Sequence, residues 1–348
     1  MTAGFTSLPI AKWPTADRLA WDAACQPGAR LKRGGAAAHL KEVTRKDLAR
    51  RYGYFLSFVE WSEGLDAQGS VAAYVTPHRV ACYVAELQKR VGSVTVQGSI
   101  YKLRRTAQLL NPAGDVRWLC DLEKDLALEV QPHSKFGRLV YSNVLLEAGL
   151  TLMAEAHSIM VCTELKRARQ VRNGLMIALL ACHPIRLKNF AGLELGRTIR
   201  KVADDWWIVL PDRETKEARH DERKVDPCLQ RWIDLYVEFY RPTLTREDRL
   251  HHFLWSSSNG DAMTYASIEK VIKATTLETI GVDVCPHLFR TAAASTVATS
   301  APDLPGLAAS LLHHTSATVT EEHYNRAKSS SAAQAFGALL RQVSSGSA

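Results

Sequence analysis

The chain has 348 residues, which exceeds the usual size of a single domain, so two domains are expected. Its hydrophobic content of 46% and charged content of 23% are ordinary for a globular protein with a full core, and its longest apolar run, residues 174–182, is too short to span a membrane. The net charge of +8 favours a polyanionic partner.

The cysteines and the N-terminal residues indicate the cellular compartment in which the protein works. Seven cysteines are scattered without a C-x-x-C pair, so the sequence predicts neither a disulfide framework nor a zinc site, and a reducing compartment fits. Residues 1–10 lack a basic segment followed by an apolar core, so they do not form a signal peptide. We therefore expect a soluble, cytoplasmic protein.

Residues 1–40 are predicted to be an N-terminal extension with one short helix. They contain Trp13, Trp21 and several basic residues. Contact of these basic residues with nucleic acid and a solvated arm without a role remain equally open.

A series of helices follows. Thr44 and Asp47 approximate a capping box at the start of the first. Thr76-Pro77 opens the second by N-cap and N1 chemistry. The third runs over about 94–110, and after the break at 111–114 a fourth reaches residue 128.

Basic residues gather on the outer faces of these helices. A solvated helix face explains each of them singly, but their clustering favours contacts with phosphates, which position a protein without reading sequence. The candidates are Arg45, Lys46, Arg50, Arg51, Lys102, Arg104 and Arg105, the last three expected to be exposed.

The polar stretch 131–135 is typical of a linker. Two further helices are expected over about 137–149 and 152–165, and they fit either domain. We place the domain boundary near residue 160.

The second half begins with a long apolar helix over about 167–181. Pro184 ends it, and Arg186 lies just past the break. Strands are expected over 198–202 and 206–210 and around 223–225, with Lys216 in the polar turn between the last two.

A helix over 229–240 is expected to end at Arg241-Pro242. Thr264 caps another that runs to Ile280, where Lys270 and Lys273 are further candidates for contact with DNA. The adjacent histidines at 251–252 lack metal-ligand spacing and are interpreted as structural or exposed.

The stretch from residue 285 to 324 carries the strongest chemical signal. Pro286 begins a helix with His287 and Arg290 three positions apart, on one face. Imidazole beside guanidinium suits a phosphate. A helix starting at 303–305 leads to His313 and His314, and the phenol of Tyr324 is a competent covalent nucleophile.

This order of motifs over residues 41–330 resembles the tyrosine recombinase (phage integrase) family. That family has an Arg at a helix exit, a Lys on a β-hairpin, H-x-x-R, L-G-H and a nucleophilic Tyr. The matching positions are Arg186, Lys216, His287 with Arg290, Leu312-His313-His314, and Tyr324. Two positions depart from the family pattern, since Asn189 stands where many members have an acid and His313 stands where they have glycine.

The resemblance implies a mainly α fold with a small β-hairpin sheet (α+β) that forms a C-shaped clamp on DNA. Residues 41–160 would be the helical core-binding domain, 161–330 the catalytic domain and 331–348 a tail helix. The implied partner is double-stranded DNA, bound by a homotetramer, without metal or cofactor and without a membrane.

The resemblance also implies roles for the site residues. Tyr324 would attack the scissile phosphate, Arg186 and Arg290 would neutralise its oxygens, and Lys216 would protonate the leaving oxygen. His287 would act as base or acid, and His314 would donate a hydrogen bond. Lys224 competes with Lys216, and His313 competes with His314. The alternative functions are a type IB topoisomerase and a non-catalytic DNA-binding protein of the same fold.

Overall fold

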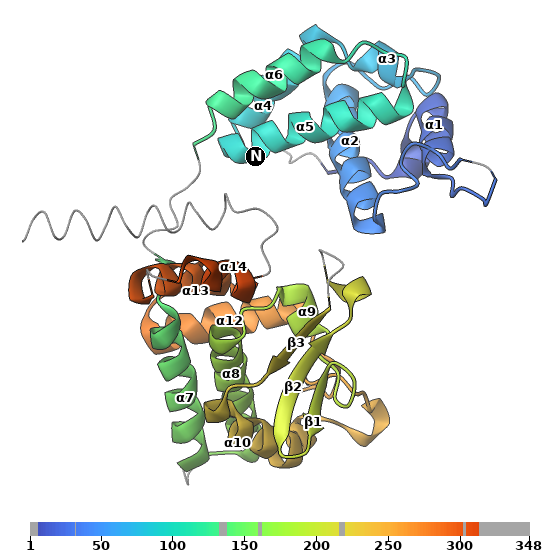
Figure 1. Cartoon of the computed structure of the whole chain (residues 1–348). Helices are drawn as coiled ribbons and strands as arrows, with labels where there is room; N and C mark the ends of the chain where they lie inside the picture. The colour runs from blue at the N-terminus through green and yellow to red at the C-terminus, as the bar shows by residue number, and fades with distance from the viewer. Residues whose placement is uncertain are drawn as a thin grey trace, which may run out of the picture. The chain divides into compact units, whose positions relative to one another are not determined.

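The computed structural model describes residues 6–31, 33–131, 138–158, 162–215, 220–301 and 304–312. The chain divides into two compact units, Met1–Ser134 and Lys135–Ala348, each with its own hydrophobic core. Figure 1 shows a helical first unit and a second unit in which a small sheet lies at one side of a group of helices. This confirms the predicted fold class, mainly α with a small antiparallel sheet.

The first unit is all-helical within its described residues. Its core is built from the apolar faces of α2, α4, α5 and α6, with aromatic side chains such as Tyr52, Phe55 and Tyr83 fully or almost fully buried. Its α-helices are α1 (Thr15–Cys25), α2 (Glu42–Ser62), α3 (Val71–Tyr74), α4 (Pro77–Gln88), α5 (Ser93–Leu110) and α6 (Arg117–Leu128).

The described residues that precede α2 contribute to this core, and the short helix predicted within residues 1–40 is α1. Trp13 is 3% exposed and Trp21 is 5% exposed, and both join the aromatic cluster of the unit. Asp17 is buried on α1, where its carboxylate accepts hydrogen bonds from the Tyr52 hydroxyl at 2.6 Å and from the Val71 amide at 2.6 Å. Burial raises the pKa of this carboxyl above its ordinary value.

The helix starts match the predicted capping chemistry in part. The Thr76 side chain accepts a hydrogen bond from the Arg79 amide, with Pro77 in the first turn, as predicted for α4. The prediction for α2 is wrong: this helix begins at Glu42 after Lys41, so Thr44 lies inside the first turn. The capping box was assigned one turn too late because the residues at 41–42 carry no capping signal.

The second unit combines helices with a sheet. Its helices are α7 (Ser142–Ser158), α8 (Glu164–Cys182), α9 (Leu187–Ala191), α10 (Pro227–Leu235), α11 (Arg241–Leu244), α12 (Tyr265–Ile280), α13 (Pro286–Ser300) and α14 (Pro305–Leu312). The buried helix α8 forms the centre of the core. In Figure 1, α13 and α14 lie together at one end of this unit, next to α12.

The described strands form one antiparallel sheet in the order β1 (Ile199–Val202), β2 (Asp205–Leu210), β3 (Asp221–Lys224). Ile199 pairs with Ile208 on β2, and Leu210 pairs with Asp221 on β3. The β2–β3 connection therefore leaves the sheet at the Leu210 end. The predicted three-stranded hairpin arrangement is confirmed to within two residues at the strand ends.

One continuous helix, α7, replaces the two helices that were predicted over 137–149 and 152–165. Gly149 does not end a helix; it lies where α7 crosses α8 at Gly174. A Cβ added to Gly149 would lie 2.7 Å from the Gly174 carbonyl oxygen, so only glycine allows this approach. This packing places α7 in the second unit, and the division falls at 134/135, earlier than the boundary predicted near residue 160.

Two helix ends complete the comparison. Arg241-Pro242 does not end the helix of residues 227–235, because a π-helical turn, Tyr236–Tyr240, leads directly into α11. Gly281 ends α12 in a left-handed conformation (φ 72°), and Thr264 caps its start, both as predicted. No helix among the described residues is long and apolar enough to cross a membrane.

Candidate active site

Arg290 is the side chain that joins the separate motifs. It lies on α13 and is only 8% exposed. Its Nη1 donates to the Pro184 carbonyl at 2.6 Å, and its Nη2 donates to the Leu312 carbonyl at 2.6 Å. One guanidinium thus connects the helix of the H-x-x-R motif, the segment just before Arg186 and the end of α14.

Arg186 is positioned by the exit from α8. That helix ends at Cys182, and Arg186 is the N-cap residue of the short helix α9, with extended backbone angles (φ −66°, ψ 141°). The preceding Ile185 is buried, whereas Arg186 itself is partly exposed. The segment is therefore anchored by the buried side chain of Ile185.

His287 occupies the first turn of α13 and is exposed, whereas Arg290, one turn later, is buried. The two share a helix, as the H-x-x-R spacing predicts, but they lie at different depths. The remaining predicted site residues lie outside the described residues, namely Lys216, His313, His314 and Tyr324. The structure thus brings Arg290 to the Arg186 segment and leaves the other pairings as predictions.

Among the described residues, the end of α14 packs on α13 through two small apolar clusters. Leu312 packs against Ala293 and Ala294, and Ala308 packs against Ala298. Such small contacts bury little apolar area. The hydrogen bond from Arg290 to the Leu312 carbonyl is therefore a major tie between α13 and the residue that directly precedes His313-His314.

The described strands place Lys224 and the start of the β2–β3 connection at opposite ends of the sheet. Lys224 is the last residue of β3, and its ammonium pairs with Asp205 at 2.8 Å, at the β1–β2 end of the ladder. The connection that contains position 216 leaves from the opposite end. There Glu214 pairs with Arg197 at 2.7 Å, which ties the start of this connection to the turn after α9.

Two buried residues near Arg186 escaped the sequence analysis. His183 is 8% exposed, and its Nε2 accepts a hydrogen bond from the Asp226 amide at 3.1 Å. Burial lowers the pKa of His183 to about 4, so the ring is neutral near pH 7. Trp255 packs on Phe190 and donates to its carbonyl at 2.9 Å, which fixes α9. In the sequence, only its position next to Pro184 could have indicated that His183 lies close to the site.

The basic residues of the first unit are largely paired with acids. Lys46 pairs with Glu42, Arg50 and Lys102 share Asp47, and Arg104 pairs with Glu123. The expectation that Lys102, Arg104 and Arg105 are exposed is wrong: all three are partly buried.

The other predicted DNA-binding residues of the first unit donate hydrogen bonds to uncharged groups. The Arg105 guanidinium donates to the Tyr101 hydroxyl, Arg51 to the Ser99 hydroxyl and Arg45 to the Cys25 carbonyl. In the second unit Lys270 is exposed on α12, and Lys273 lies 3.6 Å from Asp283. Among these residues, Lys46, Arg50 and Lys270 present the most accessible charges.

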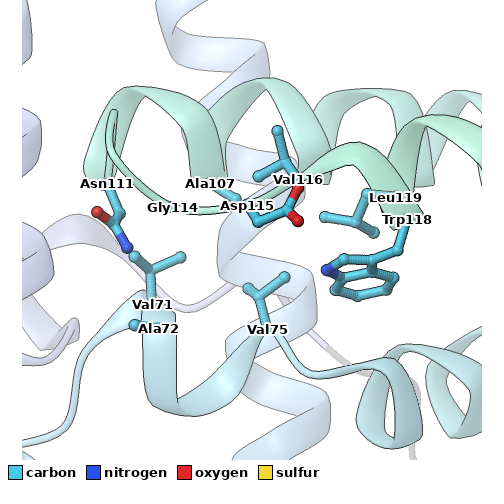
Figure 2. Close-up of a pocket in the computed structure, with 10 residues that line it drawn as sticks. All are labelled: Val71, Ala72, Val75, Ala107, Asn111, Gly114, Asp115, Val116, Trp118 and Leu119. Atoms are coloured by element: carbon cyan, nitrogen blue, oxygen red, sulfur yellow. The ribbon is translucent and has the colours of Figure 1, made fainter.

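The first unit also contains a pocket of about 190 Å³ (Figure 2). Its walls come from α3, the end of α5 and the start of α6, and its lining includes the polar side chains of Asn111 and Asp115. It contains none of the predicted site residues, so we assign it no part in the chemistry.

The chain is similar to known proteins in sequence profile and in fold. The sequence profile of the phage integrase family matches residues 151–330, more than half of the chain. Among solved structures, the XerH site-specific recombinase bound to difH substrate in a pre-cleavage complex is 13% identical, with 93% of this chain and 98% of that chain covered and a TM-score of 0.55. The lambda integrase (75–356) dimer bound to a COC′ core site is 10% identical, with 83% and 90% covered and a TM-score of 0.48. No curated protein matched in sequence.

The fold and the family match together define an enzyme that breaks and rejoins DNA. The chain belongs to the phage integrase family and is a site-specific recombinase of the tyrosine type.

Proposed function

We propose that Tyr324 is the nucleophile of this recombinase. Its Oη attacks the scissile phosphate, a 3′-phosphotyrosyl bond forms, and the bond to the 5′-oxygen breaks, which leaves a 5′-hydroxyl. The 5′-hydroxyl of a second DNA then attacks the phosphotyrosine and restores both the phosphodiester and the tyrosine. The covalent intermediate conserves the energy of the broken bond, so no nucleotide cofactor is consumed.

Arg186 and Arg290 neutralise the charge on the phosphate oxygens in the pentavalent transition state, a contribution typically worth several kcal/mol. The observation that carries this proposal is the pair of hydrogen bonds from Arg290 to the Pro184 and Leu312 carbonyls. These bonds fix the guanidinium without cancelling its charge, because carbonyls are neutral acceptors. The bond to the Pro184 carbonyl also holds the Arg290 guanidinium next to the segment that carries Arg186.

We assign the proton transfers to Lys216 and His287, and a hydrogen bond to the phosphate to His314. Lys216 protonates the leaving 5′-oxygen, and the placement of Lys224 in an ion pair with Asp205, at the far end of the sheet from that connection, supports this choice. His287 exchanges the tyrosine proton and is exposed on the first turn of α13. His314 donates a hydrogen bond to a phosphate oxygen.

The experiment that tests the nucleophile uses a nicked suicide DNA substrate, which traps the covalent protein–DNA adduct on a denaturing gel. Tyr324→Phe binds DNA but forms no adduct. Tyr265→Phe is the matched control, because Tyr265 is an exposed tyrosine on α12 of the same unit, and it keeps the adduct. An adduct of undiminished yield with Tyr324→Phe would show that another residue attacks the phosphate.

The chemical step takes its positive charge from arginine and lysine side chains, so adduct formation is expected to continue in excess EDTA. A recombinase that loses adduct formation in EDTA and recovers it on addition of Mg²⁺ alone would contradict this mechanism. Mg²⁺ is the informative ion because it is the hard cation that phosphoryl-transfer sites use.

The partner that we propose is double-stranded DNA, bound by four copies of the chain. The net charge of +8 and the bound difH DNA of the XerH structure support the DNA partner. The apolar residues after the serines at 329–331 support assembly, because an apolar stripe on a linked segment needs a surface to cover it. This feature favours a recombinase over a monomeric type IB topoisomerase. We place the protein in the cytoplasm.

A further inference from the structure

Two cysteines and an aspartate that are distant in sequence meet at the exit of α8. Cys182 is the last residue of α8, and Asp226 and Cys228 stand at the start of α10. The two sulfur atoms and a carboxylate oxygen all lie within 4.8 Å of one another. No C-x-x-C motif in the sequence indicates this group, because only the fold brings residue 182 close to residues 226–228.

The local backbone holds these side chains in place. Asp226 is the N-cap residue of α10, where its Oδ1 accepts a hydrogen bond from the Cys228 amide at 3.0 Å and Pro227 occupies the first turn. The Asp226 amide in turn donates to Nε2 of the buried His183, which follows Cys182 directly. The two sides of the cluster are therefore linked by the hydrogen bond from the Asp226 amide to the His183 ring, which does not depend on an ion.

The charges of the cluster repel one another when all three groups are ionised. Burial, together with the nearby Cys228 and Asp226, raises the pKa of the Cys182 thiol to about 12. Burial likewise raises the pKa of Cys228 to about 11, and its hydrogen bond to Asp226 acts in the same direction. That same bond lowers the pKa of Asp226, which is a carboxylate at neutral pH. A bound cation removes this repulsion.

We propose that Cys182, Asp226 and Cys228 bind a thiophilic divalent cation, with Zn²⁺ the best fit. Two thiolates and a carboxylate supply three ligands of a tetrahedral site, and the fourth position is open to water because Asp226 and Cys228 are exposed. Sulfur ligands of one tetrahedral zinc lie about 3.8 Å apart. The cluster thus needs at most side-chain rotations to close on the ion. Binding releases the two thiol protons to solvent.

The ion would join the end of α8 to the start of α10 just before Pro184 and Arg186. Its role is structural, since no step of the phosphate chemistry passes through it.

The test uses the full-length protein, reduced and freed of metal by a chelator, and titrated with Co²⁺. Cobalt replaces zinc in thiolate sites and reports sulfur ligation through an intense charge-transfer absorption. The expected result is one Co²⁺ per chain with this absorption, which Zn²⁺ then abolishes. Wild-type protein without the absorption at stoichiometric Co²⁺ would overturn the proposal, including the case in which the two cysteines only form a disulfide.

Variants assign the ligands. Cys228→Ser should weaken the charge-transfer band and lower affinity, whereas Cys120→Ser, which removes a thiol on α6 of the other unit, should leave both unchanged. Asp226→Asn keeps an N-cap acceptor and removes only the charge, so the fold is retained while affinity falls by more than about tenfold. Equal binding by the wild type, Cys228→Ser and Asp226→Asn would place the ion elsewhere and refute the site.

Discussion

Replacing Arg290 by alanine should loosen α14 as well as stop catalysis. The substitution removes the donor to the Leu312 carbonyl, a bond of 2.6 Å made by a buried charged group. Such bonds contribute roughly 1.5–3 kcal/mol each. Because α14 otherwise packs on α13 through small clusters, most of that loss should appear as local opening of α14. With about 1.4 kcal/mol per tenfold change, opening should increase about 10- to 100-fold.

Hydrogen–deuterium exchange measured by mass spectrometry on the full chain tests this magnitude. Amides of α14 should exchange about 10- to 100-fold faster in Arg290→Ala, while those of α5, in the other unit, should not change. Arg200→Ala is the control, since Arg200 is an exposed arginine on β1 of the same unit. Identical exchange of α14 in Arg290→Ala and wild type would refute the tie that we describe, whatever happens to activity.

Three further outcomes are expected. Lys216→Ala should slow cleavage of ordinary DNA by about 10²–10⁴-fold, and its cleavage rate should recover on a 5′-thio substrate, whose leaving group needs no proton. Lys224→Ala should cleave both substrates normally. If only Lys224→Ala is rescued by the 5′-thio substrate, the roles of the two lysines are exchanged. Because burial raises the folded-state pKa of Asp17, the contribution of this carboxyl to the free energy of unfolding should be largest in acid and be lost as pH rises through that pKa. In urea titrations the stability of the wild type should therefore fall relative to that of Asp17→Asn over this range, and a constant difference between the two would count against the assignment. Deleting residues from Ala332 onward should spare single-site DNA binding but abolish the tetramer in light scattering, and a tetramer of the shortened chain would argue for packing within one subunit.

Local chemical signals predicted the elements best where one residue type dictates the backbone. Thr76 with Pro77, Thr264 and Gly281 mark helix ends that the structure confirms. Gly149 misled, because a glycine that ends a helix and a glycine that allows two helices to touch look alike in sequence. The burial of Trp13 and Trp21 also could not be predicted, since the surface that covers them comes from residues far along the chain.

The sequence predicted the types and order of the candidate site residues, but not the contacts that hold their side chains in place. The H-x-x-R spacing correctly put His287 and Arg290 on one helix, yet it could not give their different depths, because depth depends on what packs against the helix. The acceptors of Arg290 are main-chain carbonyls, which every residue carries and no sequence pattern marks. The cluster of Cys182, Asp226 and Cys228 was missed for a related reason, since its spacing exists only in the folded chain.

The crossing of α7 and α8 has a consequence for anyone who wishes to build chimeric recombinases. Gly149 and Gly174 touch through bare backbone, so α7 cannot be exchanged for a helix with a side chain at that position without overpacking, which costs typically 1–3 kcal/mol. A donor module that brought its own residues up to position 160 would replace half of this matched pair. The junction for swapping the first unit should therefore fall before α7, next to residue 134, so that both glycines come from the same parent.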